Sequence, residues 1–376
     1  MTRRRSGVAA ALVGACIAVH AHDDDAAAAA RIPQRAALLA RAQAELERGD
    51  ATQALDDFER AAMMLHAADA ELGLIRAAMQ DGQYRRALAF CAHTAGEHTD
   101  DADGGALYAW LLRVGGQASQ SDRVLADARA HTPDAPVTRA AGAALALDPP
   151  VATGLLLTSP HRMAPWPSAT GGPVPPAARF ASNAVLVDDG RAALVPLAAL
   201  APESPARLWV RNGLGQAVEA SRADDAALAA RGLARLRLHA ALPVGASRES
   251  AGRAPFAGSP GYSLRFGDTR EPAWPMLTQG FLGGLAGAGA ARRVGFDSAP
   301  GAPVLDAGGA LVGITLGTTR PQAAWLPLSD ATSAPAAPAS TAARAGLALV
   351  APDEIYEAGL RRALQVLVEP RRASRQ

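Results

Sequence analysis

One serine of the chain is a candidate nucleophile for acyl-transfer chemistry. This is Ser298, in the run Asp297-Ser298-Ala299-Pro300. This chemistry needs a serine hydroxyl, a histidine that accepts its proton, an aspartate that orients the histidine, and backbone N–H groups that stabilise the oxyanion. The histidines that flank this part of the chain are His161 and His239. Isolated histidines of this kind are more often surface residues than general bases. The sequence therefore supplies a hydroxyl without a base assigned to it.

The segment that must position these groups is a series of short apolar runs after Phe180, which predict β-strands. Asp189-Gly190 and Asn212-Gly213 between them are typical of tight hairpin turns. Many short strands with Gly-rich corners favour a barrel or a sandwich. The runs are Ala184-Val185-Leu186-Val187, Arg207-Leu208-Trp209-Val210, and residues 233–238, 262–266 and 311–316.

The order of these segments over residues 180–330 resembles the trypsin-like serine proteases of the HtrA type. The most specific match is Pro303-Val304-Leu305-Asp306 followed by residues 309–314, which resemble the strands after the nucleophile. The resemblance implies a trypsin-like double β-barrel. The other matching segments are residues 184–190, Gly258-Ser259-Pro260-Gly261 and Thr278-Gln279-Gly280-Phe281-Leu282.

The resemblance also assigns the three triad positions, and none carries the required residue type. The histidine position, after the second strand, is Ala198, and the aspartate position, at the start of the strand 233–238, is Gly232. The serine position, three residues before Pro303, is Pro300. Proline has no N–H, so one oxyanion donor is missing as well. The prediction is that no residue of the domain is catalytic.

The alternative is that Ser298 is the nucleophile, with a two-residue insertion after it. Ala299-Pro300 does not supply the Gly-Gly flexibility that follows the nucleophile in the family. Ser298 is therefore kept as the second hypothesis.

An internal repeat precedes the β-rich part. Gly49-Asp50, Gly82-Gln83 and Gly116-Gln117 recur at spacings of 33 and 34 residues, each between two stretches of helical periodicity. The pattern resembles the tetratricopeptide repeat and predicts three helical hairpins over residues 34–145. Arg41 and Glu45 depart from it, because the repeat usually has apolar residues there. The alternative is an Ala-rich helical bundle. After each Gly, the matching residues are Ala54, Ala87 and Ser121, then Phe58, Cys91 and Leu125, then Ala61, Thr94 and Ala128.

The fold class is therefore multidomain, α followed by all-β. Eight prolines between 149 and 176 exclude a continuous helix and predict a semi-rigid linker. The expected segments are a signal peptide at 1–21, repeats at 34–145, a linker at 146–179, a double barrel at 180–330, an Ala/Pro/Ser-rich loop at 331–351 and a C-terminal helix at 352–369.

The N-terminus has the features of an export signal. Arg3-Arg4-Arg5 precedes a short apolar stretch and the possible cleavage site Val19-His20-Ala21. A lipoprotein signal ending at residue 15 would instead make Cys16 a lipidated N-terminus, the one expected route to a membrane. Both versions predict a bacterial envelope protein, periplasmic or secreted in the first and lipid-anchored in the second.

Composition excludes several ligand classes. The net charge is +1, which gives no electrostatic reason to expect nucleic acid as a partner. The two cysteines, Cys16 and Cys91, provide no pair for a disulfide or a structural zinc site once Cys16 is removed or acylated. No metal or other cofactor is expected.

These features favour an exported pseudoprotease that binds or scaffolds a peptide or protein partner. One alternative is an active serine endopeptidase that uses Ser298. The other is a structural spacer, with binding confined to the repeats.

Overall fold

The computed structural model describes residues 31–150, 174–200, 207–244, 255–269, 272–285, 291–316, 324–328 and 350–370. The expected signal peptide at 1–21, Cys16, His161 and most of the proposed linker and of the loop at 331–351 lie outside these residues. None of the described helices is both long enough and apolar enough to span a bilayer.

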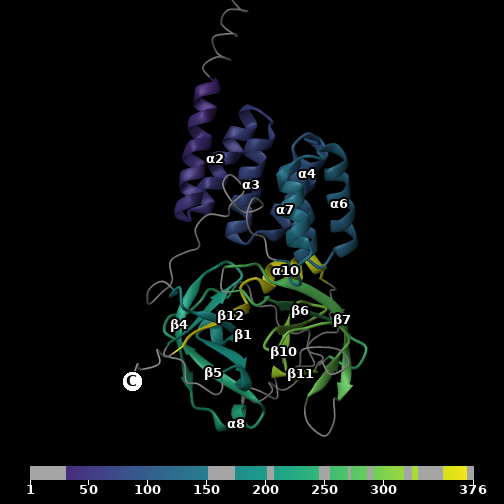
Figure 1. Ribbon diagram of the computed structural model, residues 1–376. Helices are drawn as coiled ribbons and strands as arrows, with labels where there is room; N and C mark the ends of the chain where they lie inside the picture. The colour runs from purple at the N-terminus through teal and green to yellow at the C-terminus, as the bar shows by residue number, and fades with distance from the viewer. Residues whose placement is uncertain are drawn as a thin grey trace, which may run out of the picture.

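The N-terminal part is an array of antiparallel helical hairpins (Figure 1). Residues 31–48 are helical, and Gly49, Gly82 and Gly116 each adopt a left-handed conformation with φ of 88°, 77° and 82°. Only glycine adopts this conformation without a steric penalty, so the repeated Gly marks the turn between paired helices. The remaining helices are α2 Ala51–Met64, α3 Ala68–Asp81, α4 Tyr84–Glu97, α5 Ala102–Val114, α6 Ala118–His131 and α7 Pro136–Leu145.

Small and apolar repeat positions form the core of the array. Ala54, Ala87, Cys91 and Ser121 are fully buried, and Phe58 is almost so. The two residues that depart from the repeat pattern, Arg41 and Glu45, also lie within the helical array. Arg41 pairs with the buried Asp57, and its hydrogen bond lowers the pKa of that carboxyl, while burial raises the pKa of Glu45. The expected helical hairpins are confirmed.

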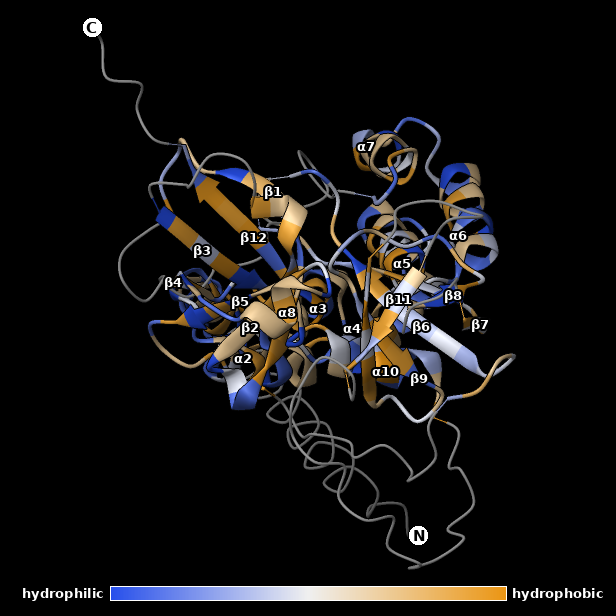
Figure 2. Ribbon diagram, turned by 90° about the horizontal axis from the view of Figure 1, so that it is seen from below, coloured by the Kyte–Doolittle hydropathy of each residue, from blue (hydrophilic) through white to orange (hydrophobic). Residues whose placement is uncertain are grey.

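The β-rich part consists of two closed six-stranded antiparallel barrels, which lie side by side below the helices (Figures 1 and 2). The first barrel has the strand order β1-β12-β3-β4-β5-β2. Its strands are β1 Arg179–Val187, β2 Ala192–Pro196, β3 Arg207–Asn212, β4 Ala217–Ala223, β5 Leu233–Leu238 and β12 Ala363–Glu369.

The second barrel has the order β10-β11-β8-β7-β6-β9. The predicted double barrel is therefore confirmed, and the sandwich is excluded. Short helical segments connect the strands of the first barrel: η2 Asp188–Gly190, η3 Leu197–Leu200 and α8 Ala226–Ala229. The strands of the second barrel are β6 Pro260–Arg265, β7 Met276–Leu285, β8 Arg292–Val294, β9 Pro303–Asp306, β10 Leu311–Thr315 and β11 Ala324–Pro327.

The expected C-terminal helix is present but shorter than predicted. Helix α10 spans Pro352–Gly359, and residues 363–369 form strand β12 between β1 and β3. The assignment of 363–369 to the helix was wrong because apolar side chains lie on both faces of β12. Leu364 packs into the first barrel, while Leu367 packs on Trp209. Burial on both faces hides the period-two alternation of a strand.

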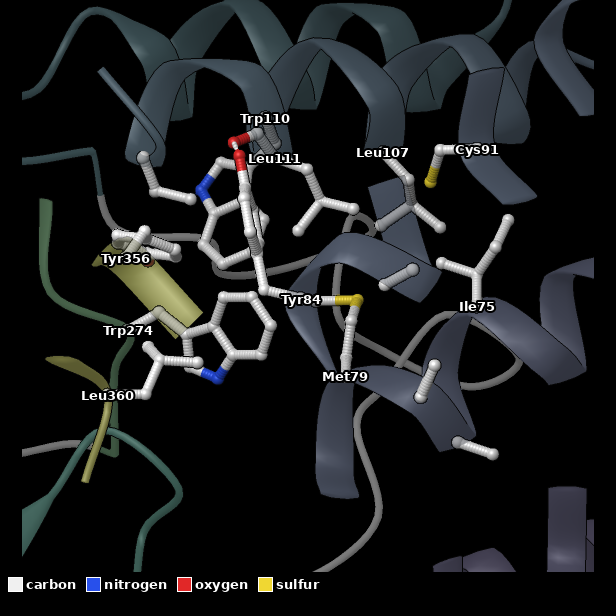
Figure 3. Close-up of a cluster of buried hydrophobic side chains, with 14 of the residues drawn as sticks. Ile75, Met79, Tyr84, Cys91, Leu107, Trp110, Leu111, Trp274, Tyr356 and Leu360 are labelled. Carbon is white, nitrogen blue, oxygen red and sulfur yellow. Dashed lines mark hydrogen bonds between the residues drawn. The ribbon is translucent and has the colours of Figure 1, made fainter. Parts of the chain in front are cut away.

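The helical array and the barrels share one hydrophobic core (Figure 3). Tyr84 of α4 and Trp110 of α5 meet Trp274, which precedes β7, and Tyr356 of α10. The ring centroids of Tyr84 and Tyr356 are 4.5 Å apart, and those of Trp110 and Trp274 are 6.0 Å apart. Such aromatic contacts add to the stabilisation from burial itself.

Both tyrosine hydroxyls of this cluster are satisfied. The Tyr84 hydroxyl donates to the Leu111 carbonyl at 3.0 Å, and the Tyr356 hydroxyl donates to the Pro275 carbonyl at 2.6 Å. Burial raises the pKa of both tyrosines, so both remain protonated donors. At the rim, Arg85 pairs with Asp353 and Glu354 of α10. Because these ion pairs are exposed, they contribute little to the stability of the protein, and their main effect is to orient α4 relative to α10.

We expect Trp274→Ala to lower the free energy of unfolding by about 3–5 kcal/mol, because it removes a large side chain from the shared core. Phe281→Ala is the matched control, since Phe281 is an aromatic residue of β7 that is 62% exposed. Urea denaturation followed by circular dichroism measures both. Equal stability of the two variants would contradict a core that joins the array to the barrels.

Candidate functional site

A cleft of about 470 Å³ lies where the two barrels meet. The first barrel contributes the start of β1 and the segment η3, and the second contributes the end of β6 and the loop before β9. Asp148 and Pro149, which follow the helical array, form a further part of the wall. The apolar lining residues include Phe180, Pro196, Phe266, Pro300 and Leu316.

Two of the three positions that the resemblance assigns to the triad line this cleft together. Ala198 enters it from η3 and Pro300 from the loop before β9. Gly232 does not line the cleft, but its carbonyl accepts a hydrogen bond from Leu197 N at 2.8 Å, directly beside Ala198. A methyl group, a hydrogen atom and a pyrrolidine ring stand at the three positions, and none of them can exchange a proton or attack a carbonyl.

The backbone of the same loop is a poor oxyanion site. Pro300 has no N–H, and the N–H of Gly301 donates to the Thr315 carbonyl at 2.9 Å. Gly301 has φ of 84°, and a Cβ at this position would lie 1.8 Å from the Asn183 carbonyl oxygen. The loop is therefore pressed against β1. Residues 300 and 301 have no free N–H to offer a developing negative charge.

Buried polar side chains hold this loop in place. The Thr315 hydroxyl accepts a hydrogen bond from Ala302 N at 2.9 Å and donates to the Ala299 carbonyl. The Ser182 hydroxyl donates to the Pro300 carbonyl at 3.2 Å. These bonds connect β10 and β1 to the loop, so its conformation is fixed from both barrels.

The alternative nucleophile, Ser298, forms no hydrogen bond with a described base. Ser298 is 4% exposed, does not line the cleft, and its hydroxyl forms no hydrogen bond with the described residues. His239 is exposed after β5, and its backbone N–H donates to the Glu219 carbonyl at 2.9 Å. The pKa of Glu219 is lowered mainly by a hydrogen bond from Arg207, and only weakly by His239. His161 lies outside the described residues.

The cleft has charged groups at its rim. Arg265 pairs with Asp148, and Asp268 lies on the same wall. The cleft thus combines apolar walls with a few charged groups, which is typical of ligand-binding clefts. Sequence reasoning missed the contribution of Asp148, Asn183 and Thr315, which come together only through the tertiary fold.

The barrel domain has the trypsin-like double-barrel fold. No protein-family profile and no curated protein matches the chain. Among solved structures, the chain is similar to the HtrA-type protease AlgW with a decapeptide, at 17% identity and a TM-score of 0.33, over 40% of this chain and 48% of AlgW. It is also similar to the MamO protease domain from Magnetospirillum magneticum in its apo form, at 18% identity and a TM-score of 0.29, over 42% of this chain and 94% of that domain. The match spans about half the length of AlgW.

We expect Thr315→Val to lower the free energy of unfolding by about 1–3 kcal/mol, because it leaves the buried Ala302 N–H and Ala299 carbonyl without this partner. Thr278→Val is the control, since Thr278 is partly exposed and its hydroxyl donates one bond, to the Ser263 carbonyl at 3.3 Å. Urea titration of both variants is the measurement. A Thr315 variant no less stable than the control would show that this hydroxyl does not hold the loop.

Proposed function

We propose that the protein binds a peptide or protein segment in the inter-barrel cleft without cleaving it. The observation that carries this proposal is the pairing of Ala198 and Pro300 in one cleft, at the positions where the resemblance places the base and the nucleophile. Among the described residues that line the cleft, Ser182 is the only one with a side-chain hydroxyl. That hydroxyl donates a hydrogen bond to the Pro300 carbonyl. Catalysis of acyl transfer without a base, a nucleophile and a complete oxyanion hole is at most residual.

The site of action that we propose is the bacterial cell envelope. This part of the proposal rests on the N-terminal sequence, in which a positive segment precedes a short apolar stretch. Removal of residues 1–21 would release the protein to the periplasm or the medium, and acylation of Cys16 would attach it to a membrane. Mass spectrometry of the mature N-terminus distinguishes the two forms.

A fluorophosphonate probe that acylates activated serines should leave the purified protein unlabelled, because no base contacts a described serine of the cleft. The protein should also leave casein intact. A Ser298→Ala variant prepared in parallel gives the background signal. Stoichiometric labelling of the unsubstituted protein that is absent from this variant would reject the proposal in favour of the endopeptidase that uses Ser298.

A large side chain at position 198 should block peptide binding in the cleft, because Ala198 lines it. We expect Ala198→Trp to reduce retention of the labelled protein on an array of immobilised random decapeptides to background, because the indole fills the cleft. Ala227→Trp is the matched control, since Ala227 is exposed on α8 and does not line the cleft.

Equal retention of the two variants would favour the spacer hypothesis, with binding confined to the repeats. Deleting the helical array is not an equivalent test. The deletion would expose the apolar faces of Trp274 and Tyr356, which pack against it.

A further inference from the structure

Three histidines and a glutamate converge at one end of the second helical hairpin. His66 lies between α2 and α3, Glu71 in the first turn of α3, His93 in α4, and His98 directly after α4. The Nε2 atoms of His66, His93 and His98 all face the carboxylate of Glu71. None of these side chains contributes to the inter-barrel cleft.

Three of these side chains, His66, Glu71 and His93, each offer a ligand atom that lies within 4.8 Å of the other two, and His98 faces the second carboxylate oxygen. His66 Nε2 lies 2.8 Å from Glu71 Oε1 and 2.9 Å from His93 Nε2, and His93 Nε2 lies 3.4 Å from Glu71 Oε1. His98 Nε2 lies 3.5 Å from the other carboxylate oxygen. In a tetrahedral zinc site with bonds of 2.0–2.1 Å, neighbouring ligand atoms are about 3.3 Å apart. The observed separations bracket this value.

The carboxylate of Glu71 is buried, and a hydrogen bond fixes its orientation. Glu71 is 3% exposed, and the buried Thr94 hydroxyl donates to its Oε2 at 2.7 Å. A hydrogen bond of this kind orients a ligating carboxylate and is typical of the residues that surround a metal site. The hydroxyl thus fixes the position of the one anionic group towards which the three imidazoles point.

His98 provides an independent indication of a ligand. Its Nε2 is buried and forms no hydrogen bond with the described residues. A buried imidazole nitrogen without a hydrogen bond is unfavourable, and a metal ion would satisfy it. The carboxylate of Glu71 has the contact with His66 and the hydrogen bond from Thr94, whereas His98 Nε2 has the 3.5 Å contact with Glu71 Oε2 and no hydrogen bond.

We propose that His66, Glu71, His93 and His98 bind one divalent transition-metal ion, with Zn²⁺ as the metal to which three imidazoles and a carboxylate are best suited. The ion carries two positive charges against one carboxylate. Asp100, Asp101 and Asp103, which line an adjoining cavity of about 680 Å³ with His66 and His98, supply negative charge nearby.

The ion would connect four segments that no disulfide joins. It would tie the α2–α3 turn to the start of α3, the end of α4 and the turn that follows, and so stabilise the array at the end where the adjoining cavity opens. No metal was expected from the sequence, because its two cysteines provide no zinc-binding pair. The four residues instead form two pairs with the same spacing, His66 with Glu71 and His93 with His98.

Isothermal titration of tag-free full-length protein with ZnCl₂ tests the site, at a pH about one unit above the ordinary imidazole pKa. We expect one ion per chain, and a dissociation constant that rises at least about tenfold in His66→Ala and in His93→Ala. Both side chains are about half exposed, so both variants should fold. His131→Ala is the control, since His131 lies on α6 beside Asp127 and outside the cluster. The affinity of this variant for zinc should be unchanged.

Two further measurements address stability and coordination. Zinc should raise the Tm of the unsubstituted protein and of His131→Ala, but not that of His66→Ala/His93→Ala. Co²⁺ bound in place of zinc should show the intense visible absorption of a four-coordinate ion, which His98→Ala should weaken. No stoichiometric binding, or equal losses in the cluster variants and the control, would overturn the site. An unchanged cobalt spectrum in His98→Ala would overturn the assignment of the fourth ligand.

Discussion

The structure depends on the burial of four aromatic side chains between the helical array and the barrels. Tyr84 and Trp110 come from the array, and Trp274 and Tyr356 from the barrel domain. Their hydrophobic surface is removed from water only when the two parts are in contact, which makes the contact obligatory. Gly82 and Gly116, the turns of the array, lie against Leu214 and Leu277 of the barrels. The array therefore has one fixed orientation above the cleft.

This fixed orientation has a consequence for the cleft. Asp148 and Pro149, which follow the last helix of the array, form part of its wall, and Asp148 pairs with Arg265 at the end of β6. The cleft is thus bounded by both barrels and by the chain that leaves the array. A loop that in an active enzyme would have to present a hydroxyl and two N–H groups is here held by Thr315 and Ser182, with a proline at its centre. Hydrogen bonds from both barrels thus fix the conformation of this loop.

Features with a local cause could be predicted from the sequence. The turns at Gly49, Gly82 and Gly116 require a left-handed residue, and strand β5 alternates between its two faces. Ala198 and Pro300 were singled out by the resemblance to trypsin-like proteases, and both line one cleft. Features that depend on packing could not be predicted in this way. Strand β12 is apolar on both faces and was taken for helix. The proposed metal site brings His66 and Glu71 together with His93 and His98, which come from another part of the array. The shared aromatic core has no local signature, because its members are up to 272 residues apart.

Strand β12 also determines the order in which the molecule can be completed. It lies between β1 and β3, and it forms ladders with both strands. In chain order, the helical array and all the other described strands of both barrels precede residues 363–369. The first barrel therefore cannot close before β12 is available. Its closure pairs residues 363–369 with β1 and β3, which are far from them in the sequence. Until β12 is in place, β1 and β3 each have an unpaired backbone edge, and such edges can pair with other extended chains.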